Sequence, residues 1–333
     1  MKQPILKRIL PFAMALLFLF AAGCGKAPAQ NKAEETAPDS VMIDGEEEEI
    51  DAADVAHSSL YAVDGGTETA DNESYASDTA NVNTVLVQNA GVLTMISADI
   101  NKTGDSAGDF SGGQNAALAV LSGGVLTLDE SNITSNAKGA FGMFVGGDGS
   151  SVTVNGTSVY TSGEESPALA LRDGGVATIT AGTLSCEGAD SACILLSGGK
   201  LLLSGVSLSA KSGEILRVLA GANELTLDKT TVSSMPELPE GATLMLRLQN
   251  GASFTGVLGG SVPAKASVTL DATSKLILTQ ETYVSGFVNA DLTHANVQSN
   301  GFNLYYDSSV AENAYLEGQS FVLPGGGFLA PII

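Results

Sequence analysis

The chain has few side chains that could perform acid–base or nucleophilic chemistry. Among its 333 residues are two histidines, His57 and His294, and three cysteines, Cys24, Cys186 and Cys193. Cleavage of a polysaccharide would need a carboxylate cluster with a basic residue within reach of the scissile bond. No stretch of this sequence brings such groups together. The scarcity of catalytic side chains predicts a protein that is not an enzyme.

A series of short polar residues recurs at one place in a repeated pattern. Its members are Asp129, Asn155, Thr180, Ser204, Asp228 and Asp271. Asp, Asn, Ser and Thr side chains bond nearby backbone amides in turns, so the series predicts corner chemistry rather than a metal or catalytic array. Arg172 beside Asp173 is interpreted as a surface ion pair rather than an activated base.

One segment is longer than the pattern requires. The segment from Asn101 to Asn115 is about nine residues longer than its counterparts in the later repeats. Gly, Ser and Asp are frequent in it. Insertions in repeat proteins form loops on one face, which is often the binding face, although a tolerated surface insertion is the alternative. Asp105, Asp109 and Phe110 are therefore the candidate interaction residues. The two aspartates could ligate Ca²⁺, but they match no calcium-loop motif, so no cofactor is expected.

The elements that must position these residues repeat along the chain. Three apolar columns recur at spacings of 24 to 33 residues, and a mostly threonine column lies between the first two. The third column comprises Ile100, Ile133, Val159, Leu184, Leu208 and Val232. Apolar and polar residues alternate within each repeat, as they do in a half-buried strand. A fixed period of this size indicates a solenoid.

The period of about two dozen residues fits three short strands and three turns, the coil of a parallel β-helix. In one coil, residues 117–121, 125–128 and 132–134 are the expected strands. Paired glycines recur at the corners, where a positive φ favours glycine. The sequence predicts an all-β parallel β-helix of roughly eight to ten coils, with the aromatic residues near its end forming a C-terminal cap.

The N-terminus has the features of an export signal. Lys2, Lys7 and Arg8 precede an apolar run over residues 9–20, which is too short for a confident membrane span. The small residues before Cys24 resemble the bacterial lipobox, although Ala21 replaces its usual leucine. That resemblance implies a signal peptide over residues 1–23, lipidation of Cys24 and an extracytoplasmic protein held on a bacterial membrane. The alternative is an ordinary cleaved signal with an incidental cysteine.

Residues 24–80 are predicted to be a disordered acidic linker. They carry fifteen acidic residues against Lys26 and Lys32, and few large apolar ones. Self-repulsion should extend such a segment. The alternative is that Glu46 to Glu49 binds calcium or a basic partner. Residues 81–333 carry ten basic and twenty-two acidic residues, a balance that opposes binding to phosphate backbones and excludes nucleic acid as an expected partner.

Two cysteines follow the linker. Cys186 and Cys193 are seven residues apart, across one expected corner. An oxidising exterior would permit a disulfide between them. Cys186 also follows the inward Leu184 by two residues, so small core residues are the equal alternative.

The rungs Gly-Gly-Val-Leu-Thr-Leu and Gly-Ser-Ser-Val-Thr-Val, with the closing segment from Tyr305 to Gly327, resemble the pectate-lyase-like right-handed β-helix proteins of bacterial surfaces, and among them the adhesin-like members. The resemblance covers about residues 80–330. It implies display and attachment, with a glycan or protein ligand on a face of the helix. The broader superfamily implies carbohydrate binding or polysaccharide cleavage, but its Asn-Thr-Asp, Asp-Asp and Gly-His-Gly motifs are absent here.

Overall fold

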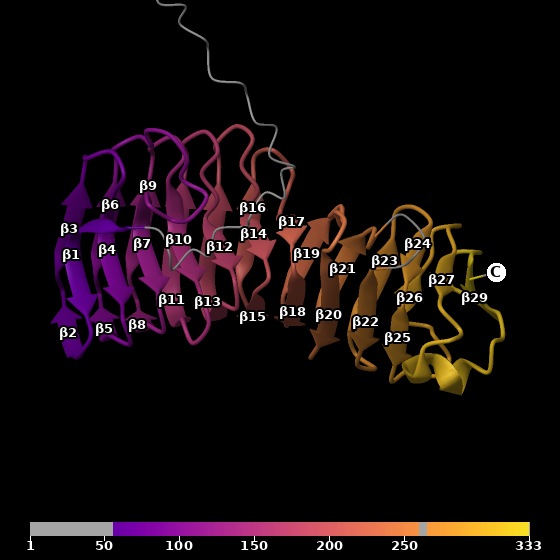
Figure 1. The fold of residues 1–333 in the computed structure, drawn as a ribbon. Helices are drawn as coiled ribbons and strands as arrows, with labels where there is room; N and C mark the ends of the chain where they lie inside the picture. Colours follow the sequence, from indigo (N-terminus) through magenta and orange to yellow (C-terminus); the bar gives the residue numbers. More distant parts are fainter. Residues whose placement is uncertain (1–55, 260–264, 333) are drawn as a thin grey trace, which may run out of the picture. The chain divides into compact units, whose positions relative to one another are not determined.

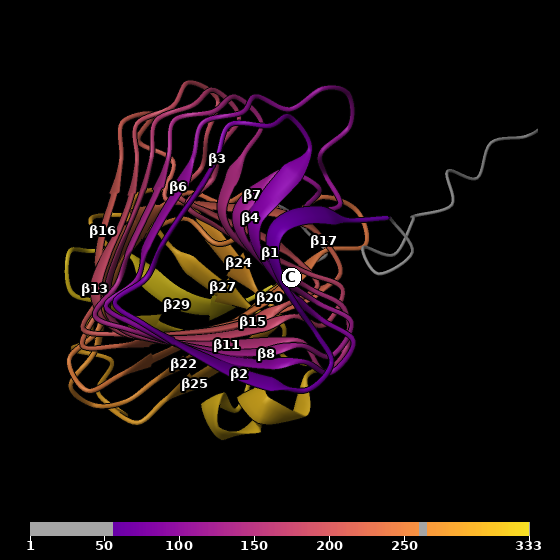
Figure 2. The same cartoon turned by 90° about the vertical axis from the view of Figure 1, so that its left-hand side faces the viewer.

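The computed structural model describes residues 56–259 and 265–332. They wind as a parallel β-solenoid of about 11 turns with almost no helix (Figure 1). The predicted all-β fold is confirmed, and the predicted count of roughly eight to ten coils falls slightly short. Viewed along the axis, the coils superpose around one interior (Figure 2).

Sheet A forms one side of the N-terminal coils. Its seven parallel strands are, in spatial order, β1 (Ser58–Asp64), β4 (Val82–Gln88), β7 (Ala116–Leu121), β10 (Phe141–Gly146), β12 (Leu169–Arg172), β14 (Ile194–Ser197) and β17 (Leu216–Ala220). The predicted strand over residues 117–121 is β7.

Sheet B has fourteen strands and runs nearly the whole length. Its main path is β2 (Thr67–Asp71), β5 (Val92–Ile96), β8 (Val125–Asp129), β11 (Ser151–Thr161), β13 (Val176–Cys186), β15 (Lys200–Ser204), β18 (Ala222–Asp228), β20 (Thr243–Gln249), β22 (Ala266–Leu270) and β25 (Gly286–Asn289). A branch adds β3 (Ser74–Ser77), β6 (Asp99–Lys102), β9 (Asn132–Ser135) and β16 (Ser207–Ala210). Strands β11 and β13 turn the corner and pair on both sides of it.

Two smaller sheets complete the C-terminal coils. Sheet C consists of β19 (Thr231–Ser234), β21 (Ser253–Gly256), β23 (Lys275–Leu278) and β26 (Val297–Gln298). Sheet D consists of β24 (Thr282–Val284), β27 (Leu304–Tyr306), β29 (Phe328–Pro331) and β28 (Phe321–Val322), whose pairing with β29 is antiparallel.

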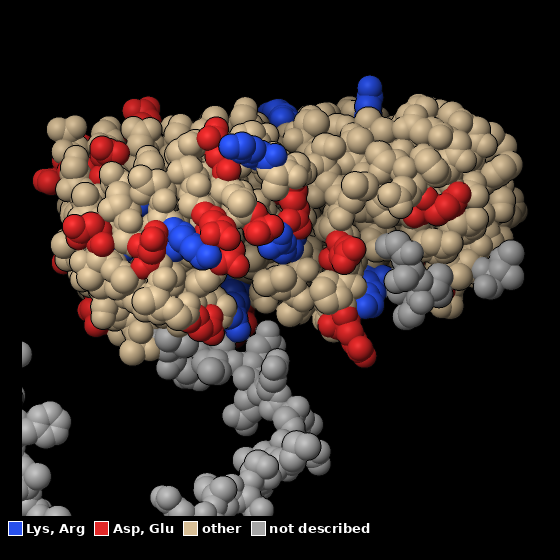
Figure 3. Space-filling view, turned by 90° about the horizontal axis from the view of Figure 1, so that it is seen from above, with Lys and Arg blue, Asp and Glu red and all other residues tan. Residues whose placement is uncertain are grey.

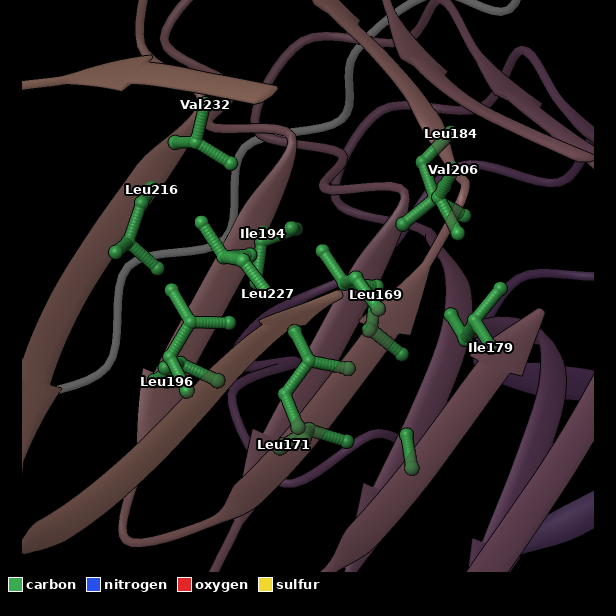
Figure 4. Close-up of a cluster of buried hydrophobic side chains, with 14 of the residues drawn as sticks. Leu169, Leu171, Ile179, Leu184, Ile194, Leu196, Val206, Leu216, Leu227 and Val232 are labelled. Atoms are coloured by element: carbon green, nitrogen blue, oxygen red, sulfur yellow. The ribbon is translucent and has the colours of Figure 1, made fainter. Parts of the chain in front are cut away.

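The apolar columns of the sequence stack in the interior. Ile100 pairs with Ile133, Ile133 with Val159, and Val159 with Leu184. These side chains are buried among the other inward residues, as the close-up in Figure 4 shows for the middle coils. Each coil thus buries its apolar edge against its neighbours, which is why a single coil is not expected to fold alone.

The corner inside β13 depends on one glycine. Gly182 has a φ of 98°, and a Cβ placed there would lie 2.1 Å from the carbonyl oxygen of Thr157 in the preceding coil. An L-residue would therefore strain the backbone and clash with the neighbouring rung.

The solenoid begins earlier than the sequence predicts. Strands β1 to β3 form a coil within residues 58–77, so the prediction that the acidic linker extends to residue 80 is wrong. Its inward positions hold Tyr61, Glu68 and Tyr75, which pair in register with Val85, Leu93 and Ile100 of the next coil. Tyr61 and Tyr75 stack with ring centroids 4.8 Å apart. Amphipathic rings cover the apolar interior here while their hydroxyl ends stay near water.

The C-terminal end of sheet B is closed by the 3₁₀ helix η2 (Ala311–Leu316). Asn313 accepts a hydrogen bond from the Phe287 amide at 2.7 Å and donates to the Ser285 carbonyl at 2.6 Å. The Tyr315 hydroxyl lies 3.0 Å from the Phe287 carbonyl. Side chains therefore occupy the edge of β25, which would otherwise recruit further strands.

Candidate ligand groove

Sheet A carries a second apolar cluster on its outer side. Every residue of β7 and β10 is buried. The inner face of these strands packs in the interior of the solenoid, and their outer face is covered as well. The outer cluster comprises Leu86, Ala116, Ala119, Leu121, Phe141, Phe144 and Ala170. A strand that is buried on both faces has no polar alternation, which explains the continuous apolar run of β7.

The insertion over residues 101–115 packs onto this outer cluster. Phe110 lies against it with its ring centroid 5.9 Å from that of Phe141. Asp105 accepts a hydrogen bond from the Lys138 amide at 2.8 Å, and Asp109 accepts one from the Ser111 amide at 2.8 Å. Bonding to Ser111 lowers the pKa of Asp109. The two aspartates thus hold the loop's backbone.

A groove of about 280 Å³ opens beside the insertion. Its floor and walls are largely apolar and aromatic, because Phe110, Phe141, Phe144, Leu195 and Leu219 line it. Sites for small molecules are commonly apolar hollows with a few placed polar groups. Phe110 is the only one of the three candidate loop residues that reaches this groove.

Two arginines supply the groove's positive charge. The Nε of Arg172 lies 2.9 Å from Asp173, and Nη1 lies 3.3 Å from the Ser111 carbonyl. The predicted pair of Arg172 and Asp173 is present. Arg217 is held by Glu214, and that hydrogen bond raises the pKa of the guanidinium. These groups can orient a ligand's oxygen atoms, and the carboxylates of Glu165 and Asp190 line the same groove.

The two histidines do not form a catalytic set. His294 is buried between the rings of Phe287 and Phe321, and burial lowers its pKa. His57 Nδ1 lies 3.4 Å from Asn83 Nδ2 at the other end of the solenoid. Over residues 56–259 and 265–332 no three His, Cys, Asp or Glu side chains gather as a metal site.

The recurring polar series stacks at the corner after the strands of sheet B. Asn155 donates to Asp129 at 2.7 Å in the preceding coil. Asp271 accepts bonds from the amides of Asn250, Thr273 and Ser274. Partial burial opposes the charge of Asp271, but these hydrogen bonds prevail and lower its pKa to about 2. These side chains therefore form hydrogen bonds at the corners of the coils, as the sequence predicts.

Three buried groups lie away from the groove. Cys186 and Cys193 are free thiols in the core, and burial, with Cys186 nearby, raises the pKa of Cys193 to about 12. The Lys102 amine donates to the Thr79 carbonyl at 2.6 Å, and burial lowers its pKa to about 8. Sequence reasoning missed Lys102, although its place two residues after the inward Ile100 could have indicated it. Cys24 lies outside the described residues.

The outer side of sheet B is open and regular. Thr69, Thr94, Thr127, Thr153 and Thr178 pair in register along it, one per coil. The next outward column over β5, β8, β11 and β13 is Val92, Val125, Ser151 and Val176. Neither column carries a charge over these strands, whereas Lys200 and Glu224 form an ion pair, 2.9 Å apart, further along.

Charge gathers elsewhere. In the view of Figure 3 the acidic and basic side chains lie mostly over the N-terminal coils, and the C-terminal coils show few. Lys138 and Glu164 pair there at 2.9 Å, and both side chains are about half exposed. Pairs so exposed contribute little to stability.

Fold and groove together define a parallel β-solenoid with a covered sheet, an open sheet and an amphipathic groove. The chain is similar to the BrkA autotransporter of Bordetella pertussis (strain Tohama I), with 28% identity over 200 residues. The match spans 58% of this chain and 18% of the relative. No family model and no solved structure matches. The similarity and the solenoid fit a β-helix surface protein.

The described segments contain no helix with the length and apolar character needed to cross a membrane.

Proposed function

We propose that this chain is a non-enzymatic, lipid-anchored surface protein that presents its solenoid to a partner in adhesion. The single observation that carries the proposal is the open side of sheet B, an in-register surface of threonine and β-branched residues. Such a surface offers many weak contacts over several coils and no place for turnover. Solenoids commonly bind through extended surfaces of this kind.

The similarity to an autotransporter supports an extracytoplasmic location, and lipidation of Cys24 would supply the means of attachment. Two or three acyl chains on Cys24 would make membrane binding stable where a single chain is marginal. The adhesin-like β-helix proteins that the rungs resemble give the same expectation.

The amphipathic groove beside Phe110 is the second place where a partner can be held. An apolar side chain or sugar face would pack on Leu195 and Leu219, with oxygen atoms near Arg172 and Arg217. The groove is small beside the open face of sheet B, so it adds selectivity rather than the main contact area.

The test is an array of glycans and proteins probed with the full chain, in calcium and in chelator, followed by product analysis on every ligand that binds. The proposal expects binding without released products and without dependence on calcium. Release of unsaturated or reducing sugars would show an enzyme and overturn it.

A further inference from the structure

Sheet A stops at β17, whereas sheet B continues past the same level through β20, β22 and β25 (Figure 1). The chain that would supply the next strand of sheet A runs from Met235 to Glu240 and forms no strand. It contains Pro236 and Pro239, and proline lacks the amide hydrogen that a strand ladder needs. Among the described residues, the edge of β17 therefore has no neighbouring strand.

The free edge of β17 presents one unpaired set of backbone groups. The Ile194 amide of β14 donates to the Ile215 carbonyl at 2.8 Å, so Ile215 and every second residue after it face β14. The residues between, Leu216 and Val218, face the break. The amide and carbonyl of Leu216 meet Ser234 Oγ at 3.2 and 3.3 Å. No hydrogen bond joins the Val218 amide or carbonyl to a described residue across the break.

A hollow of about 660 Å³ lies along this edge. Val218 and Ser234 line it and are buried, so the hollow reaches down to the core. Leu219 and Met235 also line it, and they are 46% and 61% exposed. A free strand edge beside exposed apolar side chains is the setting in which an extended peptide adds as a further strand.

The charge left over in the hollow is negative. Glu214, Glu237 and Arg217 line it, and Glu214 is already hydrogen-bonded to the guanidinium of Arg217. Glu237 is exposed, and within the described segments no ion pair joins it to another residue. Its carboxylate is thus available to a positive charge on the occupant. Complementary charge favours a basic segment over an acidic one.

Strand geometry determines the pattern that such a segment needs. Successive side chains of a strand point to opposite faces of the sheet. Val218 is buried and points inward, so a residue placed opposite it points inward too and has to be apolar. The residues on either side of that position point outward, near Leu219, Met235 and Glu237. Lysine suits them, because its methylene stem can cover apolar side chains while its ammonium reaches a carboxylate.

We propose that β17 is the docking edge for an extended segment of a partner protein in which apolar and basic residues alternate. The segment adds parallel to β17, as β14 does on the other edge. The Val218 amide then donates to the carbonyl of the basic residue before the inward apolar one. The amide of the basic residue after it donates to the Val218 carbonyl. This edge belongs to sheet A and does not depend on the adhesive function proposed for sheet B.

The probe is a fluorescently labelled peptide of alternating valine and lysine, added to the full chain. Fluorescence anisotropy measures its dissociation constant, and hydrogen exchange of the Val218 amide should slow at least about tenfold when it binds. Methylation of the lysine amides removes the donors that face β17, so binding should weaken about tenfold or more. Methylation of the valine amides is the matched control. Those amides face away from β17, so binding should stay within about twofold.

Two charge reversals test the basic positions. Glu237→Lys should weaken binding of the peptide about fivefold, because it replaces an attraction with a repulsion. Glu130→Lys makes the same change in net charge at an exposed corner after β8 and should leave the dissociation constant unchanged. Urea unfolding of both variants checks that each is folded.

Several results would overturn the proposal. Absence of binding, or equal binding of the unmodified and both methylated peptides, would mean that the edge takes no strand. Equal binding of a peptide with glutamate in place of lysine would mean that charge does not select the partner. Protection of the Val218 amide in the free chain would mean that the edge is already covered, by this chain if protection survives dilution and by a second copy if it does not. Binding that protects Val218 and is weakened by lysine-amide methylation and by Glu237→Lys alone supports the proposal.

Discussion

The outer sides of sheets A and B differ although their inner sides share one core. On sheet A, β7 and β10 are buried throughout, and the insertion at residues 101–115 packs against them through Phe110. On sheet B, β8 and β20 alternate between buried and more exposed residues along their whole length. Each coil thus packs on both faces of sheet A and leaves the outer face of sheet B open. We call the outer side of sheet A the covered wall and the outer side of sheet B the open wall.

The difference separates outer residues that pack from outer residues that stay accessible. The covered wall uses its outer residues for stability, and the groove opens only at the margin of the cover, near Leu195 and Leu219. The outer residues of the open wall contribute little to packing. Substitutions of these residues can therefore change binding without unfolding the rod.

The largest effect is expected at the centre of the covered wall. Phe144 is 1% exposed and packs against Phe141 with centroids 5.2 Å apart. Phe144→Ala should lower the free energy of unfolding by about 3–5 kcal/mol, because it removes a buried ring and leaves a cavity. Urea unfolding of the full chain measures this. A loss below about 1 kcal/mol would mean that the outer cluster is not a second core.

The loop that covers sheet A should matter less. Phe110 is only partly buried, so Phe110→Ala should cost about 2 kcal/mol and widen the groove. The measurement is urea unfolding together with accessibility of the groove to an apolar fluorescent dye. Ser106→Ala in the same loop is the control, and unchanged dye binding in Phe110→Ala would contradict the assignment of Phe110 to the groove wall.

The corner of sheet B should give a smaller, pH-dependent effect. Asp271→Asn should cost about 1 kcal/mol at neutral pH, because the amide replaces a charged acceptor of three backbone amides. The pKa of Asp271 is about 2 in the fold against an ordinary 3.8. The unfolded chain therefore binds the proton first on acidification.

The contribution of Asp271 is complete above about pH 4 and is lost as the pH falls towards 2. The difference in unfolding free energy between wild type and Asp271→Asn should shrink over this range. Urea unfolding at pH 7, 4 and 2.5 measures the difference, and one that does not change with pH would refute the role of the charge.

The smallest effect on stability is expected on the open wall. Thr153 is exposed and points outward from β11. Thr153→Ala should change the free energy of unfolding by less than about 0.5 kcal/mol. Thermal and urea unfolding measure it, and a loss comparable to that of Phe144→Ala would remove the contrast between the two walls.

The interior and the strand ladders were predictable because they repeat. The column from Met95 through Leu128, Val154 and Ile179 stacks in the predicted register, and so does the threonine column beside it. Each coil buries the same positions, so one period determines both the sheet and the direction of each side chain.

The ends and the cover were not predictable because they break the repeat. Glu68 occupies the position equivalent to the inward Leu93, so the sequence of the first coil predicts a linker rather than a strand. The insertion was expected to protrude, yet Phe110 finds a partner in Phe141, which lies about thirty residues away in sequence. The groove depends on such contacts between a loop and distant strands, and spacing alone carries no information about them.

The open wall of sheet B is the proposed binding surface. The most direct test compares Thr153→Arg with Thr183→Arg, two exposed threonines on neighbouring, paired strands. Thr183 lies beyond the corner of β13, on the branch side of the sheet. Both full-chain variants would be probed on the same glycan and protein array. The account predicts binding at least about tenfold weaker for Thr153→Arg and unchanged for Thr183→Arg. Equal binding by both folded variants would contradict it.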